Sequence, residues 1–77
     1  MNKTKAITKL QKLGAKIEEH NQSVYATFEG KKTIYIGVNP DGECNSFGVI
    51  LGYDNIQQER DMSWRSNLTQ VIKAATR

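Results

Sequence analysis

The fold of this chain is decided by residues 23–38, "SVYATFEGKKTIYIGV", in which apolar and polar side chains alternate on either side of a glycine and two lysines. β-Branched and aromatic residues at a period of two predict two strands joined in a hairpin. A two-residue turn at Gly30-Lys31 would divide the apolar residues between both faces of the sheet, because cross-strand partners share a face. A three-residue loop over 30–32 makes one face apolar. The pairs that this loop predicts are Phe28 with Ile34, Ala26 with Ile36 and Val24 with Val38.

The same parity argument extends the sheet in both directions along the chain. A four-residue turn at 39–42, "NPDG", leads into a strand over 43–51, and a two-residue turn at Asn21-Gln22 connects back to a strand over 15–19. Proline and glycine in the first turn and polar residues in the second suit tight turns. The residues that these turns add to the apolar face are Ala15, Ile17, Phe47, Val49 and Leu51.

Helical periodicity marks both ends of the chain. Residues 4–13, "TKAITKLQKL", are followed by Gly14, where a helix C-cap glycine belongs. Residues 64–75 repeat the pattern, and Asp61 or Ser63 is a candidate N-cap. The apolar positions of the two helices are Ala6, Ile7, Leu10 and Leu13, and Trp64, Leu68, Val71, Ile72 and Ala75. We therefore predict an α+β fold, a two-layer α-β-β-β-β-α arrangement with an antiparallel β-meander and both helices packed on one face.

One long connection is left between the fourth strand and the second helix. Residues 52–63, "GYDNIQQERDMS", carry no clear period. Loops of that length are uncommon in compact domains and are often functional. We expect this loop to take part in binding.

Length and composition limit what the protein can be. The 77 residues suffice for a single small domain, 1–77, whose stability is marginal, so self-association is expected. One cysteine excludes an internal disulfide. No apolar run approaches the roughly 18 residues of a membrane span. We expect a cytoplasmic protein that does not enter a membrane.

Catalytic motifs are absent from the sequence. Neither a glycine-rich phosphate loop, a metal-ligand spacing nor a paired-carboxylate motif occurs. Glu18 and Glu19 point to opposite faces of a strand, and Cys44 has no basic neighbour that would activate it. His20, the one imidazole, stands beside a turn. We predict a non-enzymatic protein with no catalytic residue, cofactor or metal.

Two surfaces are candidates for binding. The sheet face opposite the helices carries tyrosines among polar residues, Gly37, Cys44 and Ser46 included, and favours a protein partner or a homodimer. The residues that we predict to bind protein are Tyr25, Thr27, Thr33, Tyr35, Tyr53 and Arg60.

The second surface is a stripe of lysines at helical spacing with no acidic residue among them, which favours a nucleic acid as the alternative partner. The residues of this alternative site are Lys5, Lys9, Lys12, Lys16, Lys73 and Arg77. Lys31 and Lys32 are interpreted as a polar hairpin tip that adds at most an accessory contact.

The helix ending in "KLQKLG" (residues 9–14), the meander and the closing helix "SNLTQVIKAA" (66–75) resemble the HicA-type toxins, whose fold is similar to that of double-stranded-RNA-binding domains. HicA-type ribonucleases carry a catalytic histidine in a Gly-Ser-His stretch of the second strand, where this chain reads Gln22-Ser23-Val24. The Lys-Lys-x-Ala-Lys run of the RNA-binding domains corresponds here to residues 64–67, "WRSN". The resemblance therefore implies the order and packing of the helices and strands, and not the functional motifs of either family.

The sequence thus predicts a small interaction or regulatory module, adaptor-like or inhibitor-like, of the sort that phages and mobile elements encode. Binding of nucleic acid through the lysines is the first alternative. A HicA-like ribonuclease that uses His20 is the second.

Overall fold

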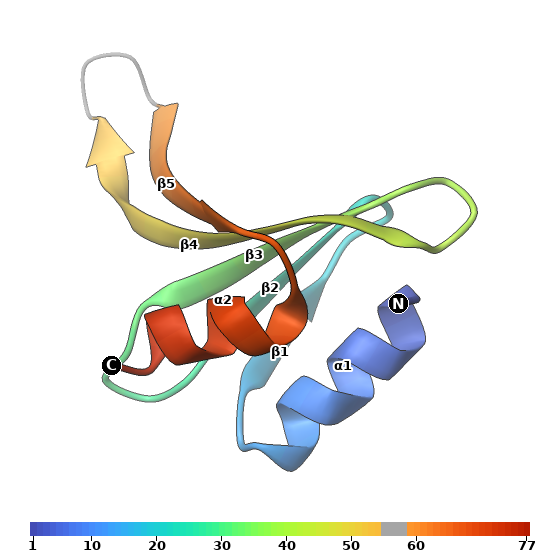
Figure 1. The fold of residues 1–77 in the computed structure, drawn as a ribbon, viewed down its shortest axis with the longest axis horizontal. Coiled ribbons are helices and arrows are strands. Elements are labelled where there is room, and N and C mark those ends of the chain that lie inside the picture. Colours follow the sequence, from blue (N-terminus) through green and yellow to red (C-terminus); the bar gives the residue numbers. More distant parts are fainter. Residues whose placement is uncertain (55–58) are drawn as a thin grey trace.

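The computed structural model of the chain describes the backbone of residues 1–54 and 59–77 and the side chains of residues 1–52 and 61–77. Two helices and five strands occur in these residues. In chain order they are α1 (Lys3–Lys12), β1 (Lys16–Glu19), β2 (Ser23–Thr27), β3 (Thr33–Val38), β4 (Cys44–Asp54), β5 (Glu59–Arg65) and α2 (Leu68–Ala75). The strands form one antiparallel meander in the order β1-β2-β3-β4-β5, and both helices lie against one face of it (Figure 1). The predicted α+β fold with two layers is confirmed.

The prediction of four strands and a long loop over 52–63 is wrong in the residues that the structure describes. β4 continues to Asp54, and β5 begins at Glu59 and pairs with it; residues 55–58 lie outside the described residues. β5 is an edge strand, and charged side chains of the kind it carries are common on edges. Trp64 consequently lies on β5, and α2 begins four residues later than predicted, with Asn67 as its N-cap.

The turn between β1 and β2 is confirmed, because Ile17 pairs with Ala26 as a two-residue turn requires. The hairpin between β2 and β3 differs from its predicted register by two residues. Ala26 pairs with Ile34, and the last pair is Thr27 with Thr33, so residues 28–32 form a wider connection. Gly30 adopts a positive φ of 73° there. A shift of two preserves the side on which each residue lies, so the apolar face of this hairpin is confirmed.

Two bulges change the predicted faces in β4. The first, opposite Gly37 and Val38, pairs Val38 with Cys44, so Cys44 packs against the core instead of lying on the tyrosine face. The second, between Ile50 and Gly52, leaves Leu51 49% exposed, contrary to its predicted place in the core. A bulge inserts one unpaired residue and so reverses the parity of the residues beyond it. Phe47 and Val49 lie between the two bulges and face the core as predicted.

The core lies between the sheet and the two helices. Its buried residues are Ala6, Leu10, Val24, Ala26, Ile34, Ile36, Val38, Val49, Leu68, Val71 and Ala75. Each large aliphatic side chain among them contributes roughly 1.5–3 kcal/mol of transfer free energy. Leu13, predicted to belong to the core, is 53% exposed because α1 ends at Lys12 and Gly14 turns the chain away with a φ of 96°.

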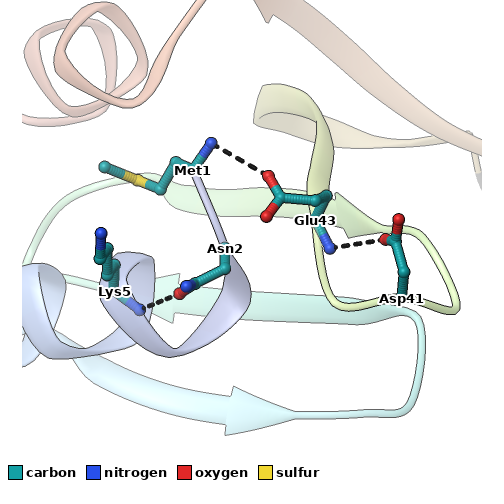
Figure 2. A network of polar contacts seen from close by, with 5 residues as sticks. All are labelled: Met1, Asn2, Lys5, Asp41 and Glu43. Carbon is teal, nitrogen blue, oxygen red and sulfur yellow. Dashed lines mark hydrogen bonds and ion pairs between the residues drawn. The ribbon is translucent and has the colours of Figure 1, made fainter.

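The start of α1 is fixed to the turn before β4 (Figure 2). The Asn2 side chain accepts a hydrogen bond from the Lys5 amide at 2.8 Å and so caps the helix. Asn2 also forms a β-bridge with Glu43, whose carboxylate lies 3.3 Å from the Met1 α-amino nitrogen. The Glu43 amide in turn donates to the Asp41 carboxylate. These contacts hold α1 in a defined orientation over the sheet.

Candidate interaction surfaces

The sheet face opposite the helices carries a row of aromatic rings that crosses the strands. His20 contacts Tyr25 with ring centroids 5.6 Å apart, Tyr25 contacts Tyr35 at 5.5 Å, and Tyr35 contacts Trp64 at 6.0 Å. Each contact is edge-on, which is a favourable geometry for aromatic pairs. We call His20, Tyr25, Tyr35 and Trp64 the aromatic face. It spans the sheet from the end of β1 to β5.

Gly48 explains how rings on β3 and β5 meet across β4. It pairs with Tyr35 on one side and with Trp64 on the other. A β-carbon at position 48 would lie 2.9 Å from the Trp64 ring and 2.7 Å from the Met62 Cε atom. Because glycine has no β-carbon, both side chains can lie across β4. Trp64 nevertheless stays 55% exposed at the margin of the sheet.

The structure places four of the predicted protein-binding residues on this face. Tyr25 pairs with Tyr35 and Thr27 with Thr33, and the two threonine hydroxyl oxygens are 3.1 Å apart. All four side chains are half-buried. Tyr53 and Arg60 pair with each other across β4 and β5, but their side chains lie outside the described residues.

The charged residues that the structure describes on the aromatic side of the sheet include two from β1. The register places Lys16 opposite Thr27 and Glu18 opposite Tyr25, so both share the face of the tyrosines. The Glu18 carboxylate lies 3.6 Å from His20 Nε2. The prediction that Lys16 continues the lysine stripe of the first helix is wrong, because Gly14 ends the helical period and β1 turns Lys16 to the opposite side of the sheet.

The remaining lysines of the stripe lie on the outside of α1. Lys5, Lys9 and Lys12 are exposed, and the ion pairs of the described residues involve none of them. Lys3, by contrast, contacts Glu19 at 2.9 Å and donates to the His20 carbonyl at 2.7 Å. Lys73 on α2 and Arg77 beyond its end are also exposed.

Cys44 is one of the residues that line a hollow of about 290 Å³ between α1 and the start of α2, together with Met1, Lys9 and Phe47. Burial raises the pKa of its thiol, the positive Met1 α-amino group lowers it, and the Glu43 carboxylate raises it. The net direction is upward, which keeps the thiol protonated and a poor nucleophile near neutral pH.

Sequence reasoning missed Trp64 and Met62 as members of the surface and Gly48 as the residue that admits them. The signal is present in "DMSWR", residues 61–65, where Met62 and Trp64 alternate with polar residues at the period of a strand. The helical spacing from Trp64 to Leu68 competes with that signal and obscures it.

Comparison with known protein families, with curated proteins and with solved structures finds no match to this chain. In the part of the chain that the structure describes, no helix is long and apolar enough to cross a membrane. Among the same residues, no three His, Cys, Asp or Glu side chains gather as metal ligands.

Proposed function

We propose that this chain is a non-enzymatic interaction module that binds a protein partner, or a second copy of itself, through the aromatic face. The observation that carries the proposal is the row of rings from His20 to Trp64, which ends in a tryptophan that is 55% exposed. Tyrosine, tryptophan and methionine are enriched at protein interfaces, and a few such side chains supply most of the binding energy.

The rigidity of the surface supports the same conclusion. The rings of Tyr25, Tyr35 and Trp64 belong to paired strands and contact one another edge-on, so little side-chain freedom is lost when a partner covers them. The contact between the Glu18 carboxylate and the His20 imidazole on this face lies at the end of the row near the sheet edge. This arrangement matches an interface with an apolar centre and a polar rim.

Replacement of Trp64 by serine tests the proposal, with Leu13→Ser as the matched control. Leu13 is 53% exposed, close to the value for Trp64, but lies at the end of α1 on the other side of the molecule. Sedimentation velocity over a concentration series measures self-association. Affinity purification from the source cells, followed by mass spectrometry, measures partner capture.

We expect Trp64→Ser to weaken self-association or capture at least tenfold, because a tryptophan that becomes buried in an interface contributes about 2 kcal/mol or more. Leu13→Ser should leave both unchanged. The proposal is wrong if the two variants behave alike, or if Tyr25→Ser/Tyr35→Ser leaves both self-association and capture intact.

A further inference from the structure

The outside of α1 forms a second surface, separate from the aromatic face. The exposed side chains that line one open hollow of about 290 Å³ on this helix are Thr4, Lys5, Thr8, Lys9 and Lys12. We call these five residues the basic face. The five residues form two adjacent rows along the helix. The hydroxyl groups of the threonines are four residues apart, and the ammonium groups of the lysines are four and then three residues apart, so neighbours in each row are about one helical turn apart.

The charge of this surface is uncompensated along its own helix. All eight acidic residues lie between positions 18 and 61, so both helices and the residues that flank them carry none. The lysine of α1 that does have an acidic partner is Lys3, which Glu19 neutralises from β1. The positive potential over α1 therefore arises from three exposed ammonium groups with no counter-charge on their own helix.

We propose that the basic face binds the phosphate backbone of a nucleic acid. Phosphate oxygens accept hydrogen bonds from lysine and threonine side chains, and such contacts dominate affinity without reading sequence. At a rise of 1.5 Å per residue, the first and last lysines of the row are about 10 Å apart along the helix axis. The N-cap and the β-bridge at the start of α1 fix the orientation of this row relative to the sheet.

Two other anionic partners fit the surface less well. A membrane would have to take up apolar side chains, but those of α1 pack against the core, Ala6 and Leu10 fully buried and Ile7 partly buried. An acidic protein would meet a surface of lysines without aromatic side chains, whereas lysine is depleted in protein interfaces. A nucleic acid requires neither an apolar nor an aromatic anchor for backbone contact.

The surface also continues toward α2. Lys9 lines a second hollow together with Ser66, Asn67 and Thr69 at the start of that helix. The positive end of the helix dipole lies there and favours anions. Lys9 is therefore the central residue of the proposed contact.

The test is fluorescence anisotropy of a labelled 20-base-pair DNA duplex at about 50 and 200 mM salt, with the chain of residues 1–77. Three phosphate contacts predict that affinity falls roughly fortyfold between these salts, from a slope near −0.9 per contact. Lys9→Gln/Lys12→Gln should reduce the fall to about three- to fourfold. The control is Lys31→Gln/Lys32→Gln in the β2–β3 connection, which removes the same charge and should keep the fortyfold dependence.

Several outcomes would overturn the proposal. It is wrong if the native protein does not bind the duplex at the lower salt. It is also wrong if both double variants lose binding equally, since net charge alone would then account for the affinity. Stronger binding to vesicles containing anionic lipid, or to an acidic peptide, than to the duplex would assign the surface to a different partner.

Discussion

Gly48 shows how one residue determines the shape of the aromatic face. An alanine there would place its β-carbon within 3.0 Å of both Met62 and Trp64. We expect Gly48→Ala to lower the free energy of unfolding by about 1–3 kcal/mol through overpacking. It should also change the fluorescence of Trp64, the single tryptophan, because the ring must move away from the new β-carbon and so change its position relative to Tyr35.

Gly52 provides the control on the same strand, because a β-carbon there would meet no atom within 4 Å. Urea denaturation followed by circular dichroism should show little change for Gly52→Ala. Equal losses in the two variants would mean that the contact with Trp64 and Met62 is not the cause.

Cys44 gives a pH dependence whose sign is set by its environment. Burial raises its pKa in the folded protein, so the unfolded chain loses the thiol proton first as pH rises. The protonated thiol makes its full contribution to the free energy of unfolding below the ordinary cysteine pKa of about 8.5. This contribution is lost as pH rises through the higher pKa that the thiol has in the folded protein. We expect the stability of the native protein to fall relative to Cys44→Ala between neutral and alkaline pH. A difference that stays constant or grows over that range would contradict the assignment.

At the scale of elements, the alternation of apolar and polar residues along a strand is the most reliable signal of which face each residue occupies. The buried face of β2, β3 and the middle of β4, from Phe47 to Val49, is predictable because a register error of two residues leaves every side chain on its proper side. The helices are predictable from their periodicity, and α1 from Gly14 as well.

The bulges and β5 are not predictable from the same signals. A bulge moves the residues that follow it to the opposite face of the sheet, and the residue types near Ile50 and Gly37 do not by themselves predict one. β5 is rich in charge because it lies at an edge, so its pattern resembles a polar loop. The candidate site is predicted only in part for this reason: Tyr25 and Tyr35 lie on central strands, whereas Trp64 lies on the strand that sequence reasoning missed.

At the scale of the whole molecule, the two proposed surfaces lie on opposite sides of a two-layer structure. Both helices lie on one side of the sheet (Figure 1). The aromatic face belongs to the other side of the sheet, and the basic face consists of exposed side chains of α1. Their contacts are also of different kinds, since aromatic burial is little affected by salt and phosphate contacts are strongly affected. Both surfaces can therefore be occupied at the same time.

A second copy that covered the aromatic face would pack the two sheets against each other and leave the two basic faces pointing outward in opposite directions. Such a dimer should bring two DNA duplexes together, which we expect to raise energy transfer between donor-labelled and acceptor-labelled duplexes mixed with the native protein at about 50 mM salt. Trp64→Ser should abolish the transfer while leaving the anisotropy of a single duplex within about twofold, because distant sites act nearly independently. Lys9→Gln/Lys12→Gln should lose both signals. Transfer that survives Trp64→Ser would show that the duplexes are joined by some surface other than the aromatic face.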